Sequence, residues 1–227
     1  MPKIGIIGGS GFYKIGVMSG ETTKLLETPF GTVRVYLGKI RGRDVAFIPR
    51  HGREHSVPPH MINYRANAYA MHMLGVEYVV ATSAVGSLRE EYRPGDLLVP
   101  DQIIDFTKSR TYTFFDGKFS IVLRDGRKRG GVYHADMTHP YCESLRRIIL
   151  EAARSRGIHI HYGGTYICTE GPRFETPAEI EFFRMIGGDV VGMTNSPEVF
   201  LFKELDICYA TICVITNYAA GMQQRIT

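Results

Sequence analysis

The sequence Thr169-Glu170-Gly171-Pro172-Arg173-Phe174-Glu175 lies between a strand pattern and a helix pattern. The residues before it, 164–168, are apolar or β-branched and predict a strand. The residues after it, 177–186, repeat apolar side chains at helical spacing. We therefore expect a loop at the end of a strand, which is where open α/β sheets bind ligands.

The composition of this loop suits a polar aromatic ligand. Phe174 offers a flat face, Glu175 a hydrogen-bond acceptor, and Gly171 a close approach of the backbone. The alternative is a surface loop that only caps the next helix, with Thr176 as N-cap and Pro177 at the first helical position. Both interpretations stay open at this stage.

Outward from this loop, apolar strands alternate with amphipathic helices, which predicts an α/β domain with a mostly parallel sheet. At 227 residues the chain is long enough for a single large domain, residues 1–227. The helix at 143–156 should bury Leu145, Ile148, Ile149 and Ala152. Residues 83–88 follow the strand at 78–82 and predict a small-residue loop. Other predicted strands are 3–7, 32–37, 44–48, 97–100, 102–106, 158–168, 189–192 and 207–216, and other helices are 63–74 and about 196–205.

Composition and charge exclude several classes of protein. The chain is 44% hydrophobic and 22% charged, and its net charge of +4 is spread without a basic stripe, so no nucleic-acid partner is expected. The start has no signal-peptide pattern, and no apolar run approaches the roughly 20 residues of a membrane span. We expect a cytoplasmic protein with no membrane partner. The chain stops at Thr227 soon after a strong strand, so a C-terminal helix is expected to be missing.

The cysteines are Cys142, Cys168, Cys208 and Cys213, without metal-binding spacing, so no metal site is expected. Free thiols in a reducing compartment are the first expectation. A disulfide is the alternative, should the source be a hyperthermophile.

Three segments at strand ends could bind an anion. Gly8-Gly9-Ser10-Gly11 follows the first strand, and such a turn presents backbone N–H groups and the Ser10 hydroxyl. Arg50, His51, Arg53 and His55 follow another strand, and arginine binds phosphate in a bidentate manner. Ser83 begins the third segment. A glycine turn or a solvated charged loop remains the alternative reading of the first two.

Several strand ends of a parallel sheet share one edge, so these groups should meet Glu175, Met193, Thr194 and Asn217. The set calls for a ligand with an anion, a middle part and a flat polar heterocycle. No Cys or Ser lies beside a base, so covalent catalysis is not indicated. His134 fits a surface residue at least as well as a catalyst.

Many motifs then match one family in register over nearly the whole chain. The chain resembles the trimeric purine nucleoside phosphorylases, in their methylthioadenosine phosphorylase branch. The resemblance implies a single domain with a mixed, largely parallel central sheet flanked by helices. It also implies cleavage of a nucleoside by phosphate, no cofactor, and a homotrimer or dimer of trimers. The matching motifs are residues 8–11, 28–31, 50–53, 84–89, 94–96, 169–174 and 193–198.

The same resemblance assigns roles to residues. The implied phosphate ligands are Ser10, Arg50, His51, Ser83, Ala84 through its backbone, and Thr194. The implied sugar contacts are Met193 and His55, and Phe174 should stack on the base. His134 should reach the site of a neighbouring subunit. The residues placed at the reacting groups are Asn217, Glu175 and His55.

Two positions bear on the choice of base. The methylthioadenosine branch has Asp-Tyr-Asp where this chain has Asn217-Tyr218-Ala219. It also has a small hydroxyl residue where this chain has Glu175. The inosine and guanosine phosphorylases resemble this chain at Glu175 and Asn217. A carboxylate accepts a hydrogen bond from the N1–H of a 6-oxopurine. N1 of adenine has no hydrogen, so a carboxylate that faces it has no donor, which costs about 1–3 kcal/mol. We expect inosine, guanosine or 5′-methylthioinosine as substrate.

Three alternatives remain. One is a 5′-methylthioadenosine phosphorylase. Another is a non-catalytic nucleoside-binding protein, which would bind without turnover. A nucleotide-dependent dehydrogenase is the third, but no helix pattern follows Gly11, as a dinucleotide fingerprint needs.

Overall fold

The computed structural model describes residues 2–8 and 18–223. Its strands are β1 (Ile4–Gly8), β2 (Ser19–Thr28), β3 (Gly31–Ile40), β4 (Arg43–Pro49), β5 (Tyr78–Ser87), β6 (Leu97–Val99), β7 (Gln102–Asp105), β8 (Ser120–Val122), β9 (Lys128–Gly130), β10 (Ile160–Tyr162), β11 (Thr165–Cys168), β12 (Val190–Gly192) and β13 (Cys208–Tyr218). Its α-helices are α1 (Tyr64–Met73), α2 (Glu143–Arg154), α3 (Pro177–Met185) and α4 (Asn195–Glu204). A short 3₁₀ helix, Pro59–Met61, precedes α1.

One mixed sheet organises the molecule, in the order β10-β6-β13-β5-β1-β4-β3-β2. The central neighbours β13, β5, β1 and β4 are parallel. A branch leaves β5 through β12 and continues to β11 and β7. The predicted α/β class with a mixed, largely parallel sheet is confirmed.

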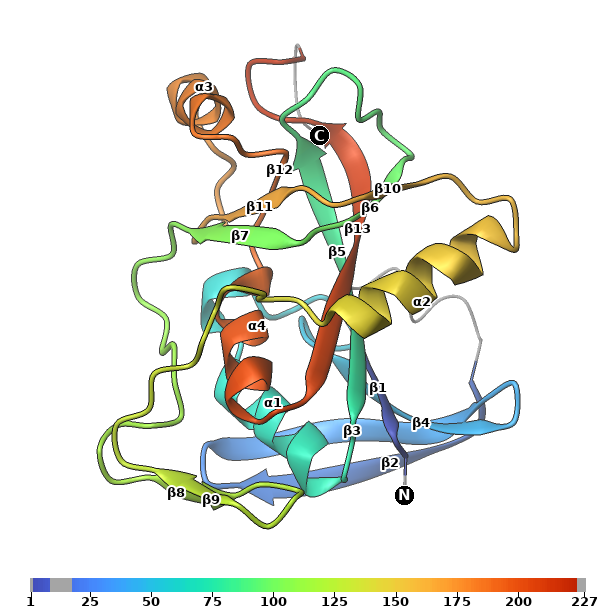
Figure 1. The fold of residues 1–227 in the computed structure, drawn as a ribbon, viewed down its shortest axis with the longest axis vertical. Helices are drawn as coiled ribbons and strands as arrows, with labels where there is room; N and C mark the ends of the chain where they lie inside the picture. The colour runs from blue at the N-terminus through green and yellow to red at the C-terminus, as the bar shows by residue number, and fades with distance from the viewer. Residues whose placement is uncertain (1, 9–17, 224–227) are drawn as a thin grey trace.

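Helices cover both faces of the central strands. Figure 1 shows α1 and α4 on one side of β5 and β13, and α2 on the other. Side chains alternate accordingly: Val79 and Ala81 of β5 join the core with α1 and α4, whereas Val80 packs with α2. A strand covered on both faces is apolar at successive positions, as residues 79–81 of β5 are.

Two neighbouring central strands extend past their predicted ends, and one predicted strand is divided into two. β5 runs to Ser87 and β13 to Tyr218, so the expected loop at 83–88 is largely strand. The two strands pair in parallel over this whole length, with an irregularity between Ile215 and Asn217, and this pairing satisfies the backbone. Residues 158–168 instead form two strands, because Gly163 and Gly164 have φ of 102° and 127°.

The buried face of α2 differs from the prediction. Leu145, Arg146, Ile149 and Ala153 are buried, while Ile148 is 55% exposed and Ala152 is exposed. The helix packs on Val99 and Ala210 through Leu145 and Ile149. This contact selects the i, i+4 row of positions 145, 149 and 153.

The cysteines divide into a bonded pair and two thiols. Cys142 and Cys208 form a disulfide that joins the residue before α2 to the first residue of β13. The expectation of free thiols is therefore wrong for these two, because α2 docks where β13 begins. Cys168 and Cys213 are free and buried, and burial raises the pKa of both.

No helix of the described residues has the length and apolar character needed to cross a bilayer. Within residues 2–8 and 18–223, no three His, Cys, Asp or Glu side chains are grouped to hold a metal ion.

Candidate active site

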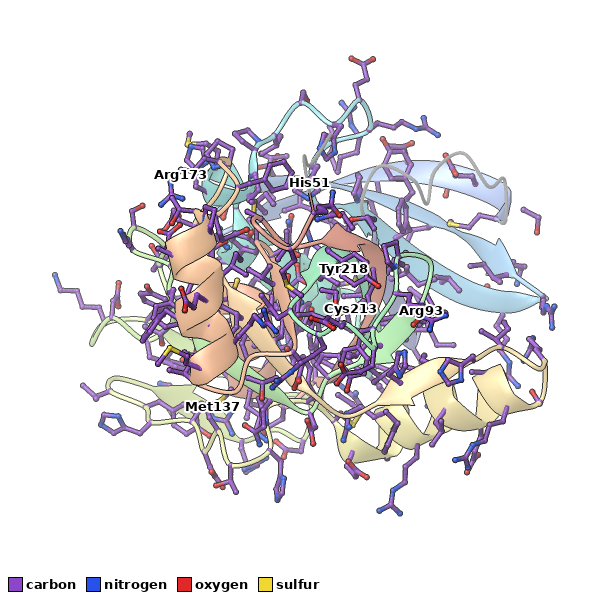
Figure 2. The ribbon with its side chains drawn as sticks, turned by 90° about the horizontal axis from the view of Figure 1, so that it is seen from above. His51, Arg93, Met137, Arg173, Cys213 and Tyr218 are labelled. Carbon is purple, nitrogen blue, oxygen red and sulfur yellow. A yellow bond between two sulfur atoms is a disulfide. The ribbon has the colours of Figure 1, made fainter. Side chains whose placement is uncertain are left out.

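Three parallel strands bring the predicted anion-binding residues to one edge of the sheet. β1 pairs with β4 through Gly8 and Pro49, and with β5 through Ile7 and Ala81. Arg50, directly after β4, therefore lies beside the Thr82–Ser83 part of β5. Ser10 lies outside the described residues. Figure 2 shows the molecule turned by 90° from the view of Figure 1, so that it is seen from above. It labels His51, which lies just after β4, and Tyr218, the last residue of β13.

Arg50 is buried and held by a carboxylate. Its Nε and Nη2 donate to the two carboxylate oxygens of Glu198 at 3.0 and 2.6 Å, and Nη1 donates to the carbonyl of Thr82 at 2.6 Å. Burial alone would lower the pKa of Arg50, but the charge and hydrogen bonds of Glu198 raise it above its usual value. Among the described residues, these partners occupy three of its five N–H groups. One N–H on each Nη atom has no partner among them.

The buried hydroxyl groups of Ser83, Tyr166 and Thr194 lie close together. The Oγ of Ser83 is 3.0 Å from the hydroxyl of Tyr166 and 3.2 Å from Oγ1 of Thr194. Ser83 and Thr194 are 5% and 6% exposed, so little of either residue is in contact with water. An oxyanion is stabilised by donors of this kind in a site with little water.

A glycine makes room for Tyr166. A Cβ at Gly192 would lie 2.1 Å from the Tyr166 hydroxyl. Burial raises the pKa of Tyr166 above its usual value, so its hydroxyl remains protonated. Tyr166 on β11 thus positions the Ser83 side chain of β5, although the two strands are not neighbours.

One ring nitrogen of His51 is hydrogen-bonded to the backbone. Its Nδ1 lies 2.9 Å from the carbonyl of Val57, which can only accept, so Nδ1 carries the proton. Burial, which outweighs this hydrogen bond, together with the charges of Arg50 and His55, lowers the pKa of His51 to about 4. The ring is therefore neutral at pH 7 and its Nε2 is an acceptor. His55 is exposed, and its ring centroid is 4.7 Å from that of His51.

The loop at 169–175 both caps a helix and exposes possible ligand contacts. Thr176 and Glu179 form a capping box at the start of α3, as the capping interpretation required. Glu175 is 7% exposed, and its Oε1 accepts from the Thr169 hydroxyl at 2.6 Å. Phe174 is 54% exposed, as a stacking residue of an open site would be. The two interpretations of this loop are compatible.

The candidate sugar and base contacts lie close to this loop or at the end of β13. Gly171 approaches Met193 so closely that a Cβ at residue 171 would be 2.6 Å from its sulfur atom. Asn217 donates from Nδ2 to the carbonyl of Tyr218 at 2.8 Å, which uses one of its two N–H groups.

The remaining predicted contacts are less direct. Ala84 is exposed beside Ser83, opposite Val214 of β13. Ala219 is 1% exposed and packs with Ile180 and Phe183, so its side chain has almost no surface for a ligand. His134 is exposed on the segment between β9 and α2.

Sequence reasoning missed Glu198, Tyr166 and Arg110 as members of the site. Glu198 lies in the first turn of α4, where the helix dipole favours any carboxylate, so its position alone does not mark it as part of a site. Its signal was a carboxylate among apolar residues, since such a group needs a cation when buried. Tyr166 and Arg110 carry no comparable signal, because their partners come from distant parts of the chain.

Comparisons with known proteins agree with this geometry. Residues 3–225 match the family model described as the Phosphorylase superfamily. A 6-oxopurine nucleoside phosphorylase of Pyrococcus furiosus is 52% identical over 225 residues, covering 99% of this chain and 83% of that protein. An S-methyl-5′-thioadenosine phosphorylase of the same organism is 50% identical over 228 residues, covering 100% and 83%. The chain belongs to the phosphorylase superfamily.

Solved structures resemble it as well. A methylthioadenosine phosphorylase from an antarctic soil metagenomic library has a TM-score of 0.88 and 38% identity, covering 99% of this chain and 75% of that one. A single-residue mutant of the adenosine/methylthioadenosine phosphorylase from Schistosoma mansoni, in complex with methylthioadenosine, has a TM-score of 0.90 and 34% identity, covering 100% of this chain and 83% of that one. The predicted family is confirmed.

Proposed function

We propose that this protein cleaves 6-oxopurine nucleosides with inorganic phosphate, giving the free base and ribose 1-phosphate or its 5-methylthio analogue. Two relatives of nearly equal identity, 52% and 50%, bear different substrate names. Overall similarity therefore does not separate 6-oxopurine from adenine substrates. The observation that carries the proposal is the nearly buried carboxylate of Glu175.

The carboxylate of Glu175 suits a base with a donor at N1. Among the described residues Oε1 already accepts from Thr169, which leaves Oε2 for a further donor. The N1–H of hypoxanthine or guanine is such a donor, whereas N1 of adenine is an acceptor. The second N–H of Asn217 would donate to O6, and most strongly when the leaving base carries negative charge.

Phosphate is the proposed co-substrate, and no other cofactor is proposed. The two remaining N–H groups of Arg50 and the hydroxyls of Ser83 and Thr194 would hold its oxygens, with Ser10 and the Ala84 backbone as further contacts. Because Nε2 of neutral His51 is an acceptor, it would take a hydrogen bond from a protonated oxygen of phosphate.

The chemistry would pass through an oxocarbenium-like transition state. Phosphate held beside Arg50 approaches one face of the sugar, which Met193 and His55 contact. The base, stacked near Phe174, leaves on the other side while Glu175 and Asn217 stabilise it. Rate would come from positioning and from charge stabilisation, without a covalent enzyme intermediate.

Release of free base from four nucleosides tests the proposal. Inosine, guanosine, methylthioinosine and methylthioadenosine are incubated with and without phosphate. We expect phosphate-dependent release of hypoxanthine or guanine and much slower release of adenine. Comparable release of adenine from methylthioadenosine would make the protein a methylthioadenosine phosphorylase, the alternative that the solved neighbours favour. Binding without release would leave a nucleoside-binding protein.

We also propose a cytoplasmic homotrimer or dimer of trimers, in which His134 reaches the site of a neighbour. The exposure of His134 supports this arrangement, because it has surface available for a second copy. Light scattering should give three or six times the chain mass. Replacing His134 by Ala should then raise KM without changing the assembly, and an active monomer would contradict the arrangement.

A further inference from the structure

Arg110 is a buried arginine that bonds both the loop at 169–175 and the segment at 193–196. It follows β7, and its side chain is 2% exposed. All five of its N–H groups have partners. Nε donates to Glu170 Oε1 at 3.2 Å, Nη1 to the Tyr64 hydroxyl at 3.1 Å and to the Ser196 carbonyl, and Nη2 to the Glu170 and Thr169 carbonyls at 2.7 and 3.4 Å.

These partners belong to two functional segments. Thr169 and Glu170 begin the loop that carries Phe174 and Glu175, the proposed base contacts. Ser196 ends the segment that carries Met193 and Thr194, the proposed sugar and phosphate contacts. One rigid guanidinium therefore fixes the two segments to each other through three backbone carbonyls.

Neighbouring bonds strengthen both attachments. Oε2 of Glu170 accepts from the backbone N–H groups of Lys108 and Ser109, so Glu170 is also tied to the two residues directly before the arginine. The hydroxyl of Ser196 donates to Oδ2 of Asp105 at 2.6 Å, and its N–H donates to the sulfur of Cys168 at 3.3 Å. The residues around Arg110 thus form one hydrogen-bonded unit.

Arg110 differs from Arg50 in the donors it has left. Arg50 has two N–H groups without partners among the described residues, whereas Arg110 has none. A guanidinium with every donor occupied does not bind substrate. Its contribution to function must come through the residues that it holds.

We propose that Arg110 is a positioning residue that couples phosphate binding to purine binding, an inference that rests on the proposed function. Phosphate bound at Thr194 orders the segment that ends at Ser196. Arg110 transmits this order to the loop of Glu175, so the base then binds at a lower entropic cost. The coupling is reciprocal, and bound base raises the affinity for phosphate by the same factor.

The test measures this coupling factor directly, in the whole protein. Calorimetry gives the Kd of hypoxanthine without phosphate and with saturating inorganic phosphate, and the ratio of the two is the factor. We expect about 5-fold or more for the native chain. Arg110→Lys cannot reach all the carbonyls and should bring the ratio close to 1. Glu170→Gln is a milder change, because it keeps the backbone carbonyl that Arg110 bonds and replaces only one side-chain oxygen. It should give an intermediate ratio.

Arg146 offers a matched control, because it is also buried, pairs with Glu143, and lies over the ring of Tyr162 as Arg110 lies over Tyr64. Arg146→Lys should lower the melting temperature without changing the coupling factor. A native chain that binds neither ligand would defeat the proposed function itself. Two results would overturn the role of Arg110 without touching the proposed function. One is a coupling factor that stays at the native value in both Arg110→Lys and Glu170→Gln. The other is an equal loss of the coupling factor in Arg146→Lys.

Discussion

At the scale of single residues, the site depends on buried polar groups that have partners. Arg50 and Glu198 have side chains only 1% and 2% exposed, and two hydrogen bonds join them. The hydroxyl of Tyr209 also donates to Glu198 at 2.7 Å. Removing one member of such a pair leaves a charge in the interior without compensation.

Glu198→Ala should therefore destabilise the protein by about 3–5 kcal/mol, measured by urea denaturation. Asp44→Ala is the comparison, since it removes an ion pair with Lys39 in which both side chains are more than half exposed. That change should have little effect. Equal effects of the two substitutions would contradict the assignment of Arg50 and Glu198 as a buried pair.

Replacing the proposed base contacts should change substrate preference rather than stability. Asn217→Asp puts an acceptor where O6 needs a donor, and it should lower the ratio of inosine to methylthioadenosine turnover. Loss of one such hydrogen bond corresponds to about 1–3 kcal/mol, or roughly 5- to 150-fold in kcat/KM. Glu175→Gln should shift the ratio in the same direction. If neither ratio moves, these side chains do not contact the base.

His51 should make the protein sensitive to acid. Its pKa is about 4 in the folded state, against an ordinary value of 6.5. Between these values the unfolded chain binds a proton that the folded chain does not. Stability is therefore complete above about pH 6.5 and falls as the pH drops toward 4, by up to about 3 kcal/mol.

The measurement is the melting temperature of the native chain and of His51→Asn between pH 7.5 and 4. The native chain should lose more stability than the variant. The pKa of His72 is also lowered by burial, but it is unchanged between the two proteins and cancels in the comparison. Parallel curves would show that His51 titrates normally.

At the scale of elements, the strands and helices with strong local patterns were predictable, and the ends of strands were not. The strands predicted at 32–37 and 44–48 are confirmed as β3 and β4, which pair in antiparallel fashion, and the Asn63 side chain caps α1. Residues 83–87 were missed as strand because Ser, Ala and Gly have weak strand propensity. Their pairing with β13 is a tertiary contact, and local sequence does not encode it.

The disulfide is also an element-scale feature, since it attaches α2 to β13 across 66 residues. Closing a loop of that length stabilises by about 4 kcal/mol in the chain-entropy estimate. In oxidising buffer the double variant with Cys142→Ser and Cys208→Ser should melt well below the native chain. In reducing buffer, which breaks the native disulfide, the two proteins should melt at the same temperature. A variant that melts with the native chain under both conditions would argue against the bond.

At the scale of the whole molecule, family and fold were recoverable from motifs in register, while the geometry of the site was not. The sequence placed Arg50, Ser83 and Thr194 in one site, and the structure brings the hydroxyls of Ser83 and Thr194 within 3.2 Å. The sequence did not reveal that Glu198 orients Arg50 or that Ala219 is buried. Both depend on how α3 and α4 pack against distant strands, which no local pattern records. The roles of the individual site residues stay predictions.

The close contact between Gly192 and Tyr166 has an evolutionary consequence. Even a methyl group at position 192 would collide with the tyrosine ring and its hydroxyl. The two positions are therefore expected to covary among descendants of this chain, so that any residue larger than glycine at 192 accompanies a smaller one at 166. A lineage that made this exchange would lose the hydroxyl that now holds Ser83, and would need another partner for that side chain to keep its present position.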